Sequence, residues 1–360
     1  MNLFVTGFPG FITRHLIPRL LTAREYRKVI LLVEERFERR ARELLADLVP
    51  KTSTEVVKGD ITQNDLALSD ERVRGLLLRE ETEWWHLAAL YRLDADLRSA
   101  RRVNVDGTRN VLAAARAAAP NVTRFNYVST AYVSGWRTGR VGEDDLPRAQ
   151  PENFKNHYEL TKNEAEWLVR SEREHLPITI YRFGIVVGDS RTGATDKFDG
   201  PYFSIKYLHR WGHLPLPRVG PMKAAINMVP VDFVVEACAL ISGRPDSSGK
   251  CFQIVDPDPI STRQLFELTA RYLGRRRMAW TLSPTWMERL VKQRWLRKRI
   301  AIPKEAIAYM NHPVHYDCSN TLEALRDTGC RCPRAEEYLP AMIEFYLANR
   351  GREELHLKVD

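Results

Sequence analysis

Residues 6–13 read Thr6-Gly7-Phe8-Pro9-Gly10-Phe11-Ile12-Thr13, and the fold prediction for this chain starts from them. They follow a short apolar run and open an amphipathic segment. Glycines at positions 7 and 10 permit a tight turn and let backbone N–H groups approach a pyrophosphate at the positive end of the following helix. A single glycine pattern is also compatible with an ordinary strand-to-helix turn. The residues predicted to contact a dinucleotide here are Gly7, Phe8, Pro9, Gly10, Phe11 and Ile12.

Apolar runs alternate with amphipathic helical patterns through the first half of the chain. This alternation predicts parallel strands joined by right-handed helical crossovers. After about residue 186 glycine, proline and tryptophan become more frequent, which indicates a different architecture. The predicted fold class is α/β, a Rossmann-type doubly wound parallel sheet with a smaller, mainly helical C-terminal substrate lobe. The predicted division places the core at residues 1–186 with a return segment at about 225–255, and the lobe at 187–224 and 256–360.

Composition excludes several classes of protein. The 360 residues are 44% hydrophobic and 28% charged, which argues against wholesale disorder. No apolar run approaches the length of about 18 residues that a spanning helix needs. The five cysteines are few and odd in number, and the first residues lack the basic and apolar segments of a secretory signal. We therefore expect a cytoplasmic protein, and no metal site, since Cys330-Arg331-Cys332 lacks zinc-ligand spacing.

The residues after the second apolar run bear on the choice of dinucleotide. Glu34 is placed to accept hydrogen bonds from an adenosine ribose, which favours NAD. Arg36, followed by two further arginines at 39 and 40, is placed to bind a 2′-phosphate, which favours NADP. An ordinary solvated helix start explains the same residues. The sequence leaves NAD and NADP both open.

Two further turns continue the pattern. Asp60, with Ile61 beside it, follows the third run and is placed to accept from an adenine amino group. Small residues after His86 would let a flat ring approach the backbone, although His86 also fits a core histidine. The cofactor-binding residues predicted after His86 are Leu87, Ala88 and Ala89.

Tyr158 and Lys162 are spaced i,i+4, which puts both on one face of a helix. A neighbouring ammonium stabilises a phenolate, so we expect the pKa of the Tyr158 phenol to fall and the phenol to exchange protons with a substrate oxygen. A second match of this spacing, Tyr202 and Lys206, lies in the glycine- and proline-rich region. The first pair is favoured because it follows Ser129-Thr130, two hydroxyls at the end of an apolar run.

An ordered series of motifs carries a family resemblance. The series is TGFPGF, GDI, HLAA, NVDGTRNVL, YVSTA, YELTK and YRFGIVVG. It resembles the extended short-chain dehydrogenase/reductase family, and YVSTAYVSG and FGIVVGDSRTG are most similar to the fatty-acyl and thioester-reductase branch of male-sterility type. The resemblance covers about residues 2–190, and 225–255 more loosely.

The resemblance implies roles for individual residues. Tyr158 is similar to the catalytic acid, Lys162 to the residue that tunes it and holds the nicotinamide ribose, and Thr130, with Ser129 as alternative, to the hydroxyl that polarises the carbonyl. Asn104 resembles a residue beside the active-site helix, and ordering a helix N-terminus explains it equally well. Two departures are Thr13 in place of the third glycine and Phe183 in place of the usual proline. The remaining cofactor-binding residues implied are Val128, Phe183 and Ile185.

The function expected from this resemblance is NADH- or NADPH-dependent reduction of an acyl thioester, carried by coenzyme A or an acyl-carrier protein, or of a related carbonyl. Reduction of a thioester yields a hemithioacetal that collapses to an aldehyde and a thiol. A ketone or aldehyde reductase, a nucleotide-sugar epimerase or dehydratase with tightly bound NAD, and a non-catalytic dinucleotide sensor are the alternatives. The sensor is disfavoured because it needs no proton donor.

Residues 271–310 concentrate positive charge. Eleven Lys and Arg against two Glu give +9, which equals the formal excess of the whole chain. A solvated helical face with tryptophans packed inward is the plainest interpretation. The alternatives are docking of an acidic acyl-carrier protein or coenzyme A phosphates, and peripheral contact with anionic lipid. Nucleic-acid binding is not expected, because no recognised module surrounds the segment.

Overall fold

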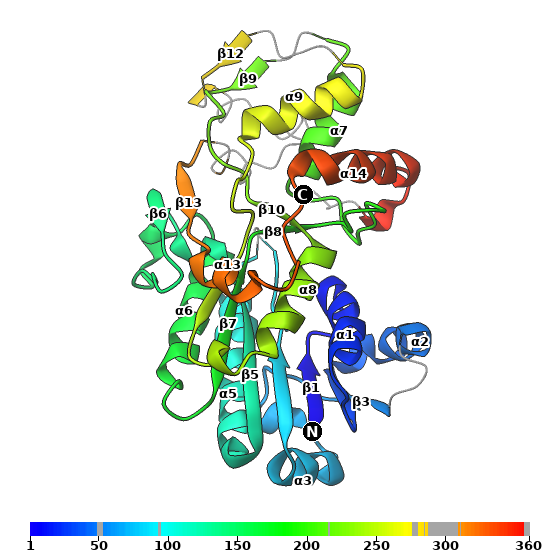
Figure 1. Cartoon of the computed structure of the whole chain (residues 1–360), viewed down its shortest axis with the longest axis vertical. Helices are drawn as coiled ribbons and strands as arrows, with labels where there is room; N and C mark the ends of the chain where they lie inside the picture. Colours follow the sequence, from blue (N-terminus) through cyan, green and yellow to red (C-terminus); the bar gives the residue numbers. More distant parts are fainter. Residues whose placement is uncertain are drawn as a thin grey trace.

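The structure, a computed structural model, describes residues 1–48, 53–92, 95–214, 217–275, 280–283, 285–286, 309 and 311–355. Its centre is a seven-stranded sheet in the order β11-β7-β5-β4-β1-β2-β3, and every pairing within it is parallel (Figure 1). The strands are β1 (Asn2–Thr6), β2 (Val29–Val33), β3 (Thr54–Lys58), β4 (Thr82–His86), β5 (Val122–Thr130), β7 (Ile178–Phe183) and β11 (Cys251–Ile254). The predicted fold class is confirmed.

Helices cover both faces of this sheet, which makes it doubly wound (Figure 1). Alternate residues of a strand point to opposite faces, so Leu3 and Val5 pack in one core, while Phe4 packs in the other. The first face carries α1 (Phe11–Ala23), α2 (Glu38–Leu48) and α8 (Val231–Ser242). The second carries α3 (Glu71–Arg79), α5 (Gly107–Ala117) and α6 (His157–Ser171). Strand β4 serves both cores, because its neighbouring Trp84 and Trp85 are buried on opposite sides.

The order of strands reverses between β1 and β4. In a doubly wound sheet, ligands bind outside the carboxyl ends of the strands at such a switch point. Helix α4 (Leu97–Arg101) leads through a π-helical turn, Arg102–Asp106, into α5 beside this point. The geometry therefore places any dinucleotide where the glycine turn after β1 meets the segment after β4.

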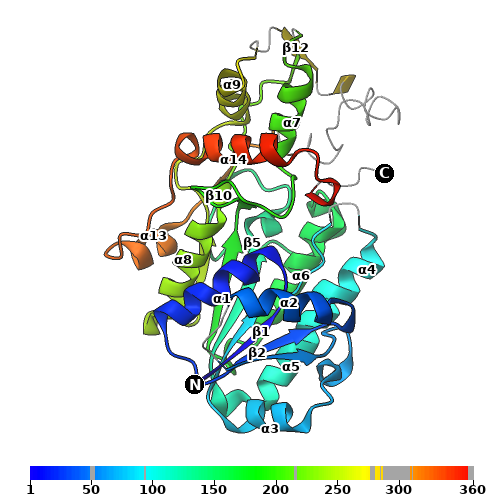
Figure 2. The same cartoon turned by 90° about the vertical axis from the view of Figure 1, so that its right-hand side faces the viewer.

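Most of the later elements lie beyond the carboxyl edge of the sheet (Figure 2). They are β8 (Ile185–Val187), α7 (Tyr202–Trp211), β9 (Pro217–Val219), β10 (Met228–Pro230), α9 (Thr262–Tyr272), β12 (Trp280–Leu282) and α14 (Ala335–Asn349). The chain then touches the core again, since β13 (Val314–Tyr316) pairs with β6 (Gly139–Val141) and α13 (Ser319–Leu325) packs against the β11 and α8 region. The lobe and core division at residue 186 stays a prediction.

Across the described ranges, we find no helix with the length and apolar character needed to cross a bilayer.

Candidate active site

Most of the predicted site residues share one edge of the sheet. They follow the carboxyl ends of six parallel strands, and such ends meet at the same edge. The structure thereby brings together groups that lie up to about 180 positions apart in the sequence. The groups are residues 7–12 after β1, 34–36 after β2, 60–61 after β3, 87–89 after β4, 128–130 at the end of β5 and 183–185 after β7.

The turn after β1 has no room for a side chain at either of its glycines. Gly7 has a φ of +92°, and a Cβ there would lie 2.8 Å from the backbone nitrogen of Ala88. A Cβ on Gly10 would lie 2.7 Å from the carbonyl oxygen of Gly7. Gly10 is also the N-cap of α1, and no side chain caps that helix end. The turn fits a pyrophosphate, because the N–H groups of the first helical turn have no partners within their helix.

Thr13, the departure from the glycine fingerprint, has a local role. Its hydroxyl donates to the carbonyl oxygens of Gly7 (3.0 Å) and Gly10 (2.8 Å). The side chain is 1% exposed. Thr13 therefore stabilises the turn from within, through its two contacts with backbone carbonyl oxygens.

The residues after β2 keep both dinucleotides possible. Arg36 Nε lies 2.7 Å from Glu34 Oε2, and the guanidinium stacks over the Phe37 ring with 4.6 Å from Cζ to the centroid. Both charged side chains are solvent-accessible, at 70% and 37% exposed. A carboxylate for ribose hydroxyls and a guanidinium for a 2′-phosphate therefore stand side by side.

Asp60 and Ile61 after β3 have local partners. The Asp60 carboxylate accepts from Thr62 N at 2.8 Å and from Thr62 Oγ1 at 3.0 Å, which is the turn chemistry expected of Asp after Gly. Ile61 is buried, and a Cβ on Gly107 would lie 2.7 Å from its Cδ1. Ile61 therefore fixes the start of α5 against the third strand, and contact with adenine stays a prediction for both residues.

His86 is a satisfied core histidine. Its Nδ1 lies 2.7 Å from Thr6 Oγ1 and its Nε2 lies 3.0 Å from Thr108 Oγ1. Because Thr6 Oγ1 accepts from Ala88 N and Thr108 Oγ1 donates to Asn104 O, the network assigns the proton to Nε2. Burial, with a smaller contribution from the Lys162 ammonium, lowers the pKa of His86 to about 3. The neutral ring ties the ends of β1 and β4 to α5 and holds the segment 87–89 beside the glycine turn.

Asn104 lies in the π-helical turn, not at a helix N-terminus. Its Oδ1 accepts from Leu90 N at 2.7 Å, and its Nδ2 donates to Thr161 Oγ1 at 3.0 Å. One buried amide thus joins the loop after β4 to the helix that carries Tyr158. Asn104 therefore bridges these two segments and does not cap a helix, and its contact with the cofactor stays a prediction.

Thr130 and Tyr158 lie together in the structure. Thr130 ends β5 and Tyr158 is the second residue of α6, and the Thr130 hydroxyl lies close enough to the phenol to affect its pKa. The same hydroxyl donates to the Phe183 carbonyl oxygen at 3.4 Å. Burial raises the pKa of Tyr158 above its ordinary value, while the neighbouring Thr130 hydroxyl opposes this rise. The expected fall in the pKa of Tyr158 is therefore not what the structure gives, because desolvation outweighs the stabilisation of the phenolate.

Lys162 bonds to residues other than Tyr158. Its Nζ donates to Tyr127 Oη and to the Val128 carbonyl oxygen, both at 2.8 Å. Burial lowers the pKa of Lys162 to about 7, and the Glu166 carboxylate opposes that fall. The ammonium is thus held against the end of β5, one helical turn from the phenol.

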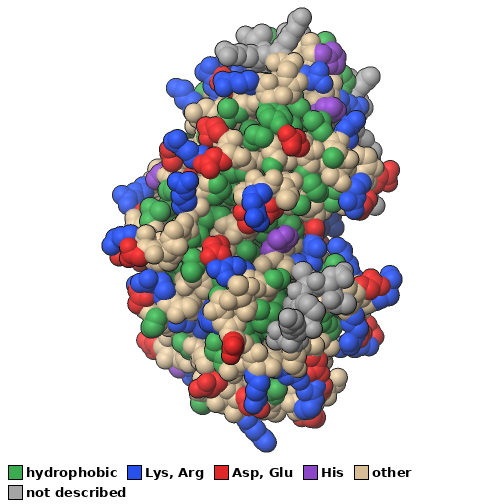
Figure 3. Space-filling view, turned by 45° about the vertical axis from the view of Figure 1, so that its right-hand side comes forward, with side chains coloured by type: hydrophobic (Ala, Val, Ile, Leu, Met, Phe, Trp, Pro, Cys, Tyr) green, Lys and Arg blue, Asp and Glu red, His purple; other side chains and the backbone are tan. Residues whose placement is uncertain are grey.

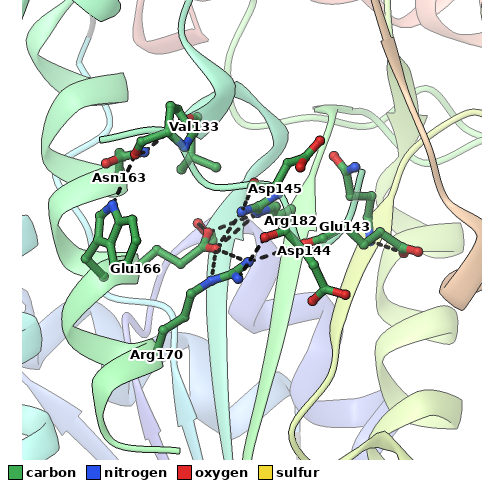
Figure 4. Close-up of polar contacts among 12 residues, drawn as sticks. Val133, Glu143, Asp144, Asp145, Asn163, Glu166, Arg170 and Arg182 are labelled. Carbon is green, nitrogen blue, oxygen red and sulfur yellow. Dashed lines mark hydrogen bonds and ion pairs between the residues drawn. The ribbon is translucent and has the colours of Figure 1, made fainter. Parts of the chain in front are cut away.

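Ser129 faces a buried ion-pair network. Its hydroxyl donates to Glu166 Oε2 at 2.7 Å. Arg182 binds the same carboxylate through Nε (3.0 Å to Oε2) and Nη2 (2.7 Å to Oε1), and Arg170 binds it from the next turn of α6 (Figure 4). Glu166 and Arg182 are fully buried. Of the two hydroxyl candidates, Thr130 contacts the phenol and Ser129 belongs to this network.

The segment after β7 keeps a strand despite the missing proline. Phe183 is the buried last residue of β7, and Ile185 begins β8, which pairs with β10. A Cβ on Gly184 between them would lie 2.7 Å from Asn227 O. The glycine therefore allows the close approach, and nicotinamide packing on Phe183 and Ile185 stays a prediction.

Sequence reasoning missed several residues around the phenol. Glu166 was within reach, since it follows Lys162 by four positions on the same helix face. Tyr91 has no comparable signal, yet its ring meets Tyr158 edge-on with 5.1 Å between centroids, and Lys197 Nζ lies 5.2 Å from the Tyr91 centroid. Tyr309, also missed, contacts the residue after Tyr158.

The basic segment 271–310 falls mostly outside the described residues, and so do most of its cations. Of its tryptophans, Trp280 and Trp286 are described, and they are 49% and 59% exposed. On the face drawn in Figure 3, Lys and Arg side chains are interspersed with Asp and Glu. This mixture agrees with the zero formal charge of the chain outside that segment. Within the described ranges no three His, Cys, Asp or Glu side chains form a metal-binding group.

This chain matches a family model and is similar in sequence to two reductases. Residues 5–238 match the family model described as male sterility protein, an NAD-binding domain. Glycine betaine reductase ATRR of Emericella nidulans is 31% identical over 222 residues, 59% of this chain and 16% of that protein. Fatty acyl-CoA reductase wat of Drosophila melanogaster is 27% identical over 275 residues, 66% of this chain and 53% of that protein. The chain thus spans between about a sixth and about half of these two relatives.

Solved structures extend the likeness over nearly the whole chain. The terminal R domain of the myxalamid PKS-NRPS biosynthetic pathway superposes with a TM-score of 0.80 at 27% identity, covering 97% of this chain and 91% of that one. UDP-glucuronic acid 4-epimerase of Bacillus cereus, solved in complex with NAD, superposes with a TM-score of 0.68 at 19% identity, covering 98% of both chains. A likeness at 19% identity shows that this chain and the epimerase share a fold, and it shows nothing further.

Proposed function

The chain belongs to the male sterility protein family within the extended short-chain dehydrogenases/reductases, as its ordered motifs predicted, and we propose that it reduces an acyl thioester with NADH or NADPH. The substrate class is an acyl group carried by coenzyme A or by an acyl-carrier protein. The observation that carries the proposal is the neighbouring pair Thr130 and Tyr158, at the carboxyl edge of the sheet that also holds the glycine turn.

The bound nicotinamide would supply a hydride to the carbonyl carbon, and the carbonyl oxygen would then gain negative charge. In this proposal Thr130 and Tyr158 donate hydrogen bonds to that oxygen, and such bonds strengthen as charge develops. The raised pKa of Tyr158 keeps the phenol protonated at neutral pH, which is the state a proton donor needs. Proton transfer from Tyr158 yields the hemithioacetal, which breaks its C–S bond to release an aldehyde and a thiol.

Lys162 is the residue we assign to the nicotinamide ribose. An ammonium has three donors, and two of them are directed to Tyr127 Oη and Val128 O. The third is then available for a ribose hydroxyl. The same two contacts fix the ammonium one turn from Tyr158, so Lys162 also supplies positive charge when the phenol gives up its proton.

The choice of a thioester rests on similarity. The chain resembles the myxalamid terminal R domain over 97% of its length at 27% sequence identity. The epimerase is 19% identical, and that likeness supports a shared fold alone. Two of the similar proteins bear the name reductase, one of them for fatty acyl-CoA. Docking of an acidic carrier at residues 271–310 is part of this proposal.

A substrate panel tests the proposal. Oxidation of NADH and NADPH is followed by absorbance with acyl-CoA, acyl-carrier protein, aldehyde, ketone and UDP-sugar substrates. We expect oxidation with a thioester and an aldehyde as the first product. Conversion of a UDP-sugar without net oxidation, or reduction of ketones alone, would contradict it.

A further inference from the structure

The first turn of α6 is contacted by a tyrosine that lies 150 residues beyond Glu159 in the chain. Asn156 is the N-cap, and its Oδ1 accepts from Glu159 N at 3.0 Å. The Tyr309 hydroxyl accepts from Asn156 Nδ2 at 2.7 Å and donates to Glu159 Oε1 at 2.5 Å. One phenol therefore bridges the N-cap residue and the third residue of the helix.

Glu159 depends on this contact because its side chain is fully buried. Its Oε2 accepts from Lys155 N at 3.1 Å, and Lys155 Nζ lies 3.9 Å away. That ammonium, also buried, lies 5.3 Å from the Tyr309 ring centroid. A buried carboxylate is costly without donors, so the loss of the Tyr309 hydroxyl leaves Glu159 Oε1 without the donor that the structure assigns to it.

Tyr158 lies between the two residues that Tyr309 joins. The N–H groups of a first helical turn have no partners within the helix, and the turn is held by its caps. A shift of about 1 Å in a catalytic group costs about 100-fold in rate. We propose that Tyr309 is a positioning residue: its hydroxyl fixes the first turn of α6 through Asn156 and Glu159 and so holds the Tyr158 phenol at the reacting carbonyl. This inference rests on the proposed role of Tyr158.

The test compares Tyr309→Phe with Tyr316→Phe in the full chain. Tyr316 is a matched control because it also packs edge-on against Tyr132, at 5.9 Å compared with 5.3 Å for Tyr309. Its hydroxyl lies 3.3 Å from Ser134, and its ring packs in the small core around β6 and β13. We expect Tyr309→Phe to lower kcat and kcat/KM together by about tenfold or more, with KM and the cofactor Kd unchanged. The reason is that the hydrogen bond from Tyr158, which Tyr309 positions, acts in the transition state. Tyr316→Phe should keep kcat within about twofold of wild type.

A second variant separates an effect on the position of Tyr158 from a general loss of folding. Asn156→Ser keeps an N-cap oxygen for Glu159 N but removes the amide that donates to Tyr309, so its kcat should fall less than that of Tyr309→Phe while thermal unfolding stays near wild type. Equal kcat in Tyr309→Phe and Tyr316→Phe overturns the inference, and so does a rise in KM alone. Tyr158→Phe separates the two proposals: if it retains turnover, the proposed role of Tyr158 fails, whereas loss of turnover in Tyr158→Phe with normal kcat in Tyr309→Phe overturns this inference only.

Discussion

The hydroxyl of Ser129 donates to Glu166, and this contact separates two neighbouring hydroxyls into different roles. Ser129 belongs to the buried network of Glu166 and Arg182, while the Thr130 hydroxyl lies beside Tyr158. Adjacent residues of a strand point to opposite faces, so one hydroxyl lies in the core network and the other lies beside the Tyr158 phenol.

Removing the Tyr158 hydroxyl should abolish most turnover. For Tyr158→Phe we expect kcat to fall at least about 100-fold, because a positioned proton donor contributes that much or more. Binding of the reduced cofactor, measured by fluorescence titration, should change little. Tyr202→Phe is the matched control, since Tyr202 begins the second match of the same spacing and its hydroxyl accepts from Gly188 N at 3.3 Å. Equal losses in both variants would contradict the assignment.

The two hydroxyls at the end of β5 should behave differently when removed. Thr130→Val keeps the shape of the side chain and loses the donor, so kcat should fall about 100-fold. Ser129→Ala removes one hydrogen bond to Glu166 and should cost about 1 kcal/mol of unfolding free energy, with turnover largely kept. Steady-state kinetics and urea unfolding of both variants check this, and the reverse pattern would assign the carbonyl contact to Ser129.

Lys162 should make unfolding depend on pH. Its folded pKa of about 7 lies below the ordinary value of 10.5, so between these values the unfolded chain binds more protons. The penalty for burying the ammonium is therefore fully present below pH 7 and is relieved as pH rises towards 10.5. Wild type should gain stability relative to Lys162→Met over pH 7 to 9, measured by urea unfolding in the absence of cofactor. A constant difference between the two proteins would show that the pKa of Lys162 is not lowered.

Glu143 should be needed for stability, since both of its oxygens accept backbone N–H groups. Oε1 accepts from Gln253 N at 2.7 Å and Oε2 from Asn320 N at 2.6 Å. Glu143→Gln must turn its amide nitrogen towards one of these donors, so we expect a loss of about 1–3 kcal/mol in unfolding free energy. Asp144→Asn, at the exposed neighbouring carboxylate, should cost much less. Equal stability of the two variants would rule out this role for the Glu143 carboxylate.

The fold was predictable because its signals are short-range. Strands alternate with helices at intervals that periodicity reveals, and the glycine turn needs a positive φ at Gly7, which a β-carbon would disfavour. The spacing of Tyr158 and Lys162 follows from helical geometry alone. These features involve residues within a few positions of one another, so local sequence encodes them.

The partners of those residues were not predictable in the same way. Lys162 meets Tyr127, 35 positions away, and Tyr309 meets Glu159, 150 positions away. The predicted docking segment 271–310 lies mainly outside the described residues and stays a prediction. Sequence thus established the family, the parallel sheet and the candidate proton donor. Folding placed Thr130 beside Tyr158 and Ser129 against Glu166, and it turned Lys162 towards the end of β5. It also raised the pKa of Tyr158, because burial and long-range hydrogen bonds arise when distant segments pack together.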